Sequence, residues 1–538
     1  MRPAEGQQQG YIRYRQQQGS TQDDTTRYLC AAAHLDSAFA DEAIREFLLE
    51  PTRPVPPSPG IHAASVLVEA VAARTRRKVR DGALAVQALT FVWLAWGSAL
   101  LHGWIAVAVI ASVPAIWRRS ATRTAAALKV AGCVAALVAA PFVATRFSAD
   151  ALRALVGNGS FSSGSGGDVQ SLAALILCFL MLVTLVTDRL IVWQLAYGRF
   201  GRRARHLPPS NPFDQERMIL NLSPPGFLRQ IVRYAAPTPE LGGAAPLVVY
   251  RGSDPFIGAG VRRVSWSVAL PLEKLPEGKP DGSPFGELTT AGLYESIRMA
   301  MNSLRHNDLL SPGERLRGLR TAEAVYVPAD KLIDQLNRPE VTAYLSHPDG
   351  RPSPLLPAEE VLARRTQPKE WARYYLGFHL AAWAGDLTLS GFVQAAAGDG
   401  MFTLEWTQYV LPPVREEYRA IDKPPGGLLT PIREAALRWL KLPASIVGRT
   451  VHTLGVLVPA HRERGVFNSD AYGSLRTLRE MGADDKVRDH LQLSDVSRYE
   501  NIMRATLVRA VGTHLRDCGY SPERFERWAE GLPGTNLA

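Results

Sequence analysis

The distribution of apolar residues divides the chain into two contrasting stretches. Between residues 83 and 198 the sequence is almost continuously apolar, and basic residues gather at its flanks. From about residue 240 to 415, short segments alternate between apolar and polar positions with the two-residue period of β-strands. This pattern predicts an α+β membrane protein, in which a transmembrane block precedes a cytoplasmic domain.

Four segments of the apolar block are predicted to be transmembrane helices: 84–101, 104–117, 124–145 and 171–190. A helix needs about 20 apolar residues to cross the hydrocarbon core of a bilayer. The run 83–117 is too long for one ordinary span and slightly short for two. It is therefore either a hairpin of two helices or one long tilted helix, and the flanking charges favour the hairpin.

Basic residues stand on both sides of the run 83–117, which places both flanks in the cytoplasm by the positive-inside rule. The loop 146–170 is rich in glycine and serine and has balanced charge, as expected of an external loop. A bundle of about four transmembrane helices, with both termini cytoplasmic, satisfies every loop. The sequence thus predicts a multi-pass protein of the cell membrane. The charged residues Lys129, Asp188 and Arg189 are expected near helix ends, where their side chains reach the interface.

The rest of the chain divides by composition. Residues 1–25 are predicted to be a disordered arm, 26–80 a cytoplasmic helical segment, and 207–239 a proline-rich linker. Residues 425–538 are predicted to form a helical C-terminal region. Within it, the amphipathic stretch 427–465 either lies on the anionic inner leaflet or packs on the cytoplasmic domain.

Strand periodicity defines a domain over residues 240–415. The predicted strands are 247–251, 261–270, 322–328, 372–383, 387–397 and 401–411, and helical patterns interrupt them at 290–304, 330–345 and 358–370. The connections "AGD" and "GDG" between the last three strands are short enough for tight hairpins. We therefore expect a mostly antiparallel α+β domain. Beyond it, apolar residues at helical spacing in 494–517 predict a core-facing helix.

Composition and charge narrow the class of protein. The chain has 538 residues, 46% hydrophobic and 21% charged, with a formal net charge of +10. This length predicts two or three structural units. The basic residues flank the apolar segments instead of forming one stripe, so we expect a lipid bilayer as partner and no nucleic acid. The arginine- and alanine-rich usage is typical of a bacterial protein. The four cysteines form no CxxC pair, which indicates reduced thiols.

The stretch "RGSDPFIGAG", residues 251–260, has two interpretations. As a turn, Ser-Asp-Pro starts it, the glycines allow positive φ, and Phe256 with Ile257 enters the core. As a site, backbone N–H groups beside glycines form an anion nest with arginines around it. The candidate ligand-binding residues are Arg251, Gly252, Asp254, Gly258, Gly260 and Arg262. Only the second interpretation implies a partner, either a small anionic ligand or a protein, and no cofactor is specified.

Other polar positions have simpler interpretations. His379 alternates with aromatic residues on a predicted strand, which favours a hydrogen-bonded histidine over a catalytic base. The cluster "DDKVRDH", 484–490, is typical of a solvated helix face, so no metal site is predicted. Trp266 and Trp406 are expected in the core, with a stacking wall for a ligand as the alternative.

Signatures of catalysis are missing from the sequence: it has no GxxxxGK[ST], GxSxG or HExxH motif. We therefore expect a membrane-anchored sensing, regulatory or interaction module. The missing motifs disfavour an enzyme without excluding one. One alternative is a membrane-bound enzyme that acts on a lipid or nucleotide-like substrate near residues 251–263. Another is an oligomeric pore or transporter.

Overall fold

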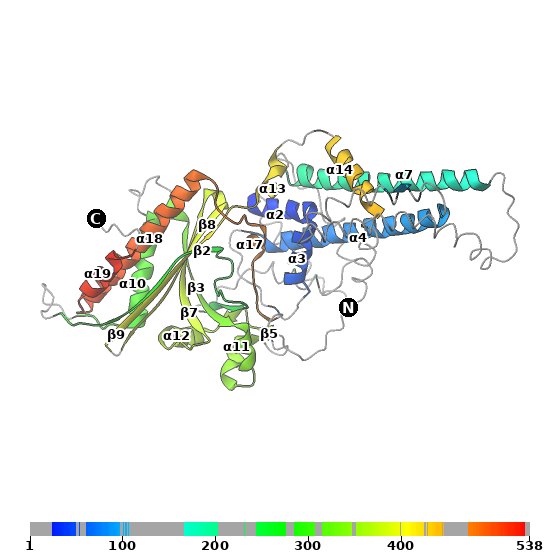
Figure 1. Ribbon diagram of the computed structural model, residues 1–538. Helices are drawn as coiled ribbons and strands as arrows, with labels where there is room; N and C mark the ends of the chain where they lie inside the picture. The colour runs from blue at the N-terminus through cyan, green and yellow to red at the C-terminus, as the bar shows by residue number, and fades with distance from the viewer. Residues whose placement is uncertain are drawn as a thin grey trace, which may run out of the picture. The chain divides into compact units, whose positions relative to one another are not determined.

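A computed structural model describes most of the chain in several stretches (Figure 1). The described residues are 24–49, 61–96, 166–202, 244–275, 285–306, 315–346, 351–398, 400–423, 429–443 and 472–532, with a few isolated positions between them. The chain forms two compact units. Unit 1 comprises residues 1–71, 213–420 and 465–538, and unit 2 comprises 72–212 and 421–464.

A seven-stranded sheet organises unit 1. Its strands are β1 (Ala245–Tyr250), β2 (Val261–Pro271), β3 (Leu319–Pro328), β6 (Leu355–Leu356), β7 (Arg373–Ala382), β8 (Leu387–Gly398) and β9 (Met401–Leu411). The spatial order is β2-β9-β8-β7-β3-β1-β6. All neighbours pair antiparallel except β1 and β3, which are parallel. A two-stranded sheet pairs β4 (Leu345–Ser346) with β5 (Arg351–Pro352).

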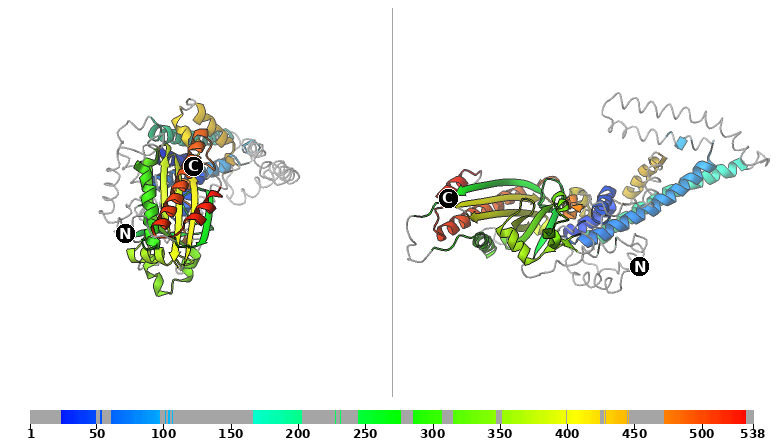
Figure 2. Two further views of the ribbon diagram at one scale, coloured as in Figure 1. Left: turned by 90° about the vertical axis from the view of Figure 1, so that its left-hand side faces the viewer. Right: turned by 90° about the horizontal axis from the view of Figure 1, so that it is seen from below.

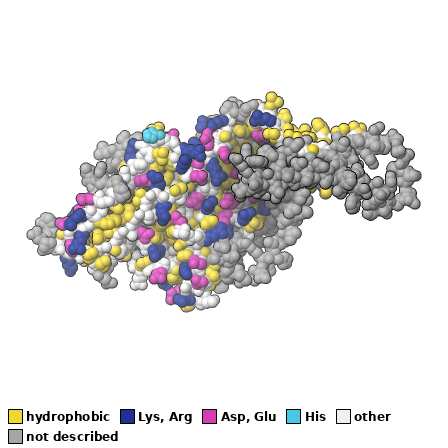
Figure 3. Space-filling view, viewed as in Figure 1, with side chains coloured by type: hydrophobic (Ala, Val, Ile, Leu, Met, Phe, Trp, Pro, Cys, Tyr) yellow, Lys and Arg dark blue, Asp and Glu magenta, His cyan; other side chains and the backbone are white. Residues whose placement is uncertain are grey.

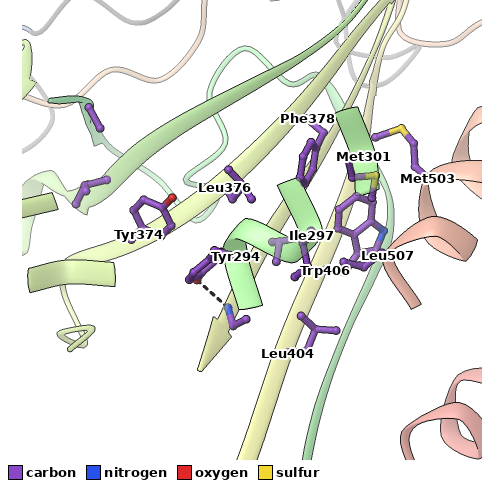
Figure 4. Packing of buried hydrophobic residues seen from close by; sticks show 14 of the residues in the cluster. Tyr294, Ile297, Met301, Tyr374, Leu376, Phe378, Leu404, Trp406, Met503 and Leu507 are labelled. Atoms are coloured by element: carbon purple, nitrogen blue, oxygen red, sulfur yellow. Dashed lines mark hydrogen bonds between the residues drawn. The ribbon is translucent and has the colours of Figure 1, made fainter. Parts of the chain in front are cut away.

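One face of this sheet packs against helices. Helices α10 (Thr290–Ser303) and α18 (His490–Asp517) lie next to each other along the sheet, as Figures 1 and 2 show. Figure 4 shows Ile297 and Met301 of α10 beside Trp406 of β9, with Met503 of α18 close by. The backbone N–H of Ala395 donates to the Tyr294 hydroxyl at 2.8 Å. The main core therefore lies between the helices and this first face.

Five further helices in the described part of unit 1 are short. They are α11 (Ala329–Asp334), α12 (Ala358–Thr366), α13 (Glu416–Arg419), α17 (Leu478–Gly482) and α19 (Glu523–Glu530), with 3-10 turns at Leu304–His306, Arg315–Gly318, Pro339–Tyr344, Trp383–Gly385 and Ala420–Asp422. Trp528 of α19 packs edge-on against Trp266 of β2, with ring centroids 5.1 Å apart. The first face is therefore covered as far as the edge strand.

Helices α2 (Asp24–Leu35) and α3 (Ser37–Phe47) open the described chain. The Asp36 carboxylate caps α3 by accepting bonds from two backbone N–H groups, at Ala38 and Phe39. His34 of α2 lies 2.9 Å from Glu69 of α4 (Ala63–Leu94), and both side chains are buried. This polar pair joins two helices of unit 1 that are far apart in the sequence.

Most of the predicted strands and helices of the sheet domain are confirmed. Each of the six predicted strands overlaps an observed strand, and the predicted helices 290–304 and 358–370 correspond to α10 and α12. The predicted helix 330–345 is broken into α11 and a 3-10 turn. On α18, five of the six predicted core positions are buried and Ile502 is partly buried; the five are Val496, Tyr499, Met503, Leu507 and Val511.

Unit 2 contains two long helices that run side by side. They are the part of α4 from Ala72 onward and α7 (Gly166–Trp193), which continues as a π-helical turn at Gln194–Arg199. Figures 1 and 2 show them adjacent, and a Gln87–Thr184 hydrogen bond of 3.2 Å joins them. Helix α14 (Leu429–Leu440) packs on α7, where Trp439 donates to the Cys178 carbonyl at 3.1 Å.

The predicted bundle of about four transmembrane helices is wrong, and with it the prediction of a multi-pass membrane protein. Within the described stretches, one helix is long and apolar enough to cross a membrane, Leu172–Arg199. The predicted span 84–101 falls largely on the end of α4, which carries charges up to Asp81. The described part of α4 after Asp81 ends at Leu94, short of the roughly 20 apolar residues that a span needs. The α+β character of the other unit agrees with the sequence.

Several predicted segments lie wholly or mostly outside the described residues. They are the disordered arm 1–25, the spans 104–117 and 124–145, the linker 207–239 and most of the amphipathic stretch 427–465. The choice between a membrane-bound and a domain-bound 427–465 stretch stays open for its undescribed part.

Candidate functional site: the second face of the sheet

The second face of the seven-stranded sheet carries polar, small and aromatic side chains. Because residues directly opposite in a sheet share a face, the pairing assigns these positions strand by strand. One row across the sheet is Arg262, Tyr409, Ser390, His379 and Arg320, from β2, β9, β8, β7 and β3.

Two further rows follow the first. The second row is Ser265, Thr407, Phe392, Gly377 and Ala322. The third is Ser267, Glu405, Gln394, Tyr375 and Ala324, in which Gln394 and Tyr375 follow the paired residues Val393 and Leu376 by one position. Arg320, Ala322, Ser265 and Ser267 are exposed. The second face is therefore partly open to a binding partner, unlike the helix-covered first face.

The loop 251–260 crosses this second face. It joins β1 to β2, which four other strands separate in the sheet. Five strand spacings correspond to about 24 Å along the sheet, a distance that ten residues can bridge at about 3.3 Å each. This crossover explains the length of the loop.

Phe256 fixes the loop to the sheet. Its ring stacks on Phe392 with centroids 4.1 Å apart and meets the edges of Tyr326 and Tyr375 at 5.2 and 4.9 Å. Tyr409 lies 5.4 Å away. Phe256 is 6% exposed, so the turn interpretation, in which this residue enters a core, is confirmed. We call these five rings the Phe256 cluster.

Asp254 is held by the same cluster. Both of its carboxylate oxygens accept from the Tyr409 hydroxyl at 2.9 Å, and one accepts from the Phe256 N–H at 3.0 Å. Burial, followed by the neighbouring carboxylate of Asp254, raises the pKa of Tyr409 well above its usual range. Tyr409 therefore stays protonated at any physiological pH and acts as a donor to Asp254.

The glycines of the loop form a nest that an internal carboxylate occupies. Gly258 and Gly260 have φ of 92° and 91°, and the Gly260 N–H donates to Glu480 of α17 at 3.0 Å. The Gly258 N–H also bonds this carboxylate, and Thr477 completes a capping box with it. Burial raises the pKa of Glu480, whereas these hydrogen bonds lower it by a smaller amount. The nest thus binds an anion, and that anion is part of the chain.

The other predicted site residues lie apart from this nest. Arg251 pairs with Glu46 of α3 at 2.6 Å, and Gly252 has a φ of 90° beside the Leu475 side chain. Arg262 is exposed and stands in the row with Tyr409. The structure therefore brings Gly258 and Gly260 together, and it directs Asp254 and Arg262 toward Tyr409. Ligand binding by these residues stays a prediction.

His379 lies in the middle of the second face. Its Nδ1 is 2.9 Å from the Ser390 hydroxyl, and its ring meets the edge of Phe392 at 5.5 Å. Burial lowers the pKa of His379 to about 4. The imidazole is therefore neutral at physiological pH, and the expectation of a hydrogen-bonded histidine is confirmed.

Acid is expected to destabilise the fold through His379. The unfolded chain takes up this proton near pH 6.5, whereas the folded chain resists it until about pH 4. The neutral, buried His379 therefore stabilises the fold above pH 6.5. As the pH falls toward 4, the free energy of unfolding drops by about 2 kcal/mol through this residue. Urea unfolding of the full chain at pH 7 and 4.5 measures it. His379→Asn should lose about 2 kcal/mol less than the wild type, and an equal loss in both would contradict the prediction.

Other candidate groups are structural. Asp489 is the N-cap of α18 and accepts bonds from Leu491 and Gln492. Residues 484–489 lie between α17 and α18, so the interpretation of 484–490 as a helix face is wrong. Cys518 lies 3.8 Å from the Nε2 of His514, but it is buried and its thiol points to the Glu287 carbonyl. This geometry offers a substrate no open nucleophile at that pair.

The sequence interpretation missed the residues that complete the site: Tyr326, Tyr375, Phe392, Tyr409 and Glu480. Each of the four rings lies on a different predicted strand, at a position that alternates with the core-facing residues. This alternation was a usable signal that they share one face of the sheet. Glu480 had no such signal, because it lies 220 residues from Gly260. Trp266 and Trp406 belong to the first-face core, so the interpretation of them as a ligand wall is not supported.

Comparison with known proteins adds one finding. Residues 265–533, half of the chain, match a family described as the AbeC-like domain. The match begins within β2 and extends past α19, so it contains most of the second face but not the loop 251–260. No curated protein and no solved structure matches the chain.

Proposed function

The chain belongs to the AbeC-like domain family, and on this premise we propose that it is a membrane-anchored recognition protein and not an enzyme. Helix α7 attaches the chain to the cell membrane. The second face of the sheet binds an acidic ligand or an acidic segment of a partner protein. The row from Arg262 to Arg320 is the observation that carries this proposal.

The surface of α7 supports the anchoring. Large apolar side chains are exposed along it, at Leu172, Leu175, Ile176, Phe179 and Leu180. Figure 3 shows hydrophobic side chains on the visible surface of this helix. A contiguous apolar surface of this kind marks a membrane or protein interaction site, and the length of Leu172–Arg199 suits a bilayer.

The chemistry of the second face supports recognition. Two exposed arginines, Arg262 and Arg320, stand at the ends of a row of hydroxyl and imidazole groups. Arginine, tyrosine and neutral histidine supply hydrogen-bond donors and ring faces, which are typical of interfaces that bind carboxylates or phosphates. The neutral His379 and the strongly held proton of Tyr409 make poor general bases at neutral pH.

Thermal unfolding of the full chain in detergent, with nucleotides, phosphorylated metabolites and a polyglutamate peptide, tests recognition. A ligand at 100 times its Kd stabilises by about 2.7 kcal/mol. We expect one of these acids to raise the midpoint in the wild type and in the control Arg509→Gln, an exposed position on α18. The double variant Arg262→Gln and Arg320→Gln should lose the shift. An equal shift in all three proteins, or no shift with any acid, would overturn the proposal, and consumption of the ligand would indicate an enzyme.

A further inference from the structure

An arginine cluster surrounds a single buried carboxylate in unit 2. The Asp188 carboxylate of α7 lies 2.9 Å from Arg80 Nη1, 3.2 Å from Arg189 Nη2 and 3.3 Å from Arg76 Nε. Asp188 and Arg189 are each 5% exposed. Three guanidinium groups thus converge on one carboxylate between two adjacent helices.

Positive charge is in excess at this cluster. Arg80 also pairs with Asp81 at 2.8 Å, and Arg189 reaches the half-exposed Glu434 of α14 at 3.8 Å. Arg438, one turn along α14 from Glu434, adds a fourth guanidinium. Each guanidinium has five N–H donors, so the three carboxylates leave many of these donors to other acceptors. The buried Nε of Arg189 has no hydrogen-bond partner among the described residues.

The titration of the arginines agrees with this excess. Burial, followed by the neighbouring charges of Arg189 and Arg80, lowers the pKa of Arg438 to about 10. Burial likewise lowers the pKa of Arg76 to about 10, opposed by Asp188 and assisted by the other arginines. An additional anion beside Arg438 and Arg189 would relieve this repulsion.

Apolar surface adjoins the cluster. Leu190 and Ile191 follow it directly on α7, and Val79 of α4 and Leu437 of α14 flank it. All four side chains are exposed. Next to them, Trp193 and Tyr197 pack with ring centroids 4.8 Å apart. Tryptophan and tyrosine are enriched where a membrane helix meets the headgroup layer. The occupant that fits is therefore an oxyanion that carries apolar chains.

We propose that the arginine cluster around Asp188 binds the phosphate group of an anionic phospholipid, with Arg438 and Arg189 as its donors. The acyl chains lie along the exposed apolar residues of α7. Basic pockets between helices at the membrane surface bind such headgroups in general. This assignment rests on the membrane anchoring by α7 proposed above, and it gives that anchor a preference for one lipid class.

Native mass spectrometry of the full chain in a nonionic detergent tests the site with dioleoyl phosphatidylglycerol, dioleoylglycerol and inorganic phosphate. Phosphatidylglycerol should bind, and dioleoylglycerol, which has the same chains without phosphate, should not. Arg438→Gln should weaken the lipid affinity roughly tenfold, as expected for one charge-assisted hydrogen bond. The matched control is Arg433→Gln, an exposed position on the same helix, which should bind like the wild type. Arg438→Lys should recover part of the affinity.

Three outcomes would overturn the site: equal binding of dioleoylglycerol, equal affinity of Arg438→Gln and wild type, or displacement of the lipid by excess inorganic phosphate. The last result would assign the cluster to a soluble phosphate. Circular dichroism of each variant confirms that the helices form. Flotation with neutral phosphatidylcholine vesicles tests the anchor separately. A wild type that floats but does not discriminate between lipids refutes only the phosphate site, whereas one that does not float refutes the anchoring.

Discussion

Replacing Phe256 with alanine is expected to lower the free energy of unfolding by about 3–5 kcal/mol. The ring touches four other aromatic rings and is almost fully buried, so its removal leaves a cavity in the centre of the Phe256 cluster. It also removes the attachment that fixes the loop 251–260 to the sheet. Urea unfolding of the full chain, followed by tyrosine and tryptophan fluorescence, measures the loss.

The neighbouring Ile257 supplies the control for this experiment. Its side chain is only partly buried at the margin of the same cluster. Ile257→Ala should therefore destabilise the fold by clearly less than Phe256→Ala. If the two variants unfold at the same urea concentration, the cluster does not carry the attachment of the loop.

Asp188→Ala is expected to destabilise unit 2 by a similar amount, about 3–5 kcal/mol. The substitution leaves Arg80, Arg189 and Arg76 facing one another with their shared carboxylate gone. Removing one partner from a buried ionic cluster is costly because the remaining charges stay desolvated. Thermal unfolding of the detergent-solubilised chain, followed by helical circular dichroism, should show a lower midpoint.

A second substitution separates charge from packing at this position. The double variant Asp188→Ala and Arg189→Ala removes one of the cations that faced the lost carboxylate, and its other partner, Glu434, is half-exposed. It should therefore be more stable than Asp188→Ala alone. A double variant that unfolds below the single one would mean that the packing of these side chains, and not their charge balance, holds the two helices together.

Local patterns predicted the meander β7-β8-β9 because every signal for it is short-range. The strands alternate, and their connections pair Ala382 with Leu387 and Gly398 with Met401. The parallel pairing of β1 with β3 has no such local signal, because Leu247 and Val325 meet only through the tertiary fold. The pairing with β9 likewise makes β2 an edge strand, which its alternation alone did not specify.

The candidate site shows the same division. The glycines at 252, 258 and 260 were expected to allow positive φ, and all three do. The anion that they bind could not be predicted from the loop, because the carboxylate belongs to Glu480, 220 residues further along the chain. The membrane prediction failed for a related reason. The apolar run that begins near residue 83 continues a helix that is charged up to Asp81, and its described apolar part ends at Leu94, too early for a span.

The loop 251–260 is held by residues from both ends of the chain. Glu46 from the N-terminal helices pairs with Arg251, and Glu480 from the C-terminal segment binds the nest at Gly258 and Gly260. During synthesis, these partners are made hundreds of residues apart. The crossover therefore cannot reach its final conformation until residue 480 has left the ribosome and helix α17 has docked. Until then, the loop over the Phe256 cluster lacks its hydrogen bond to Glu480.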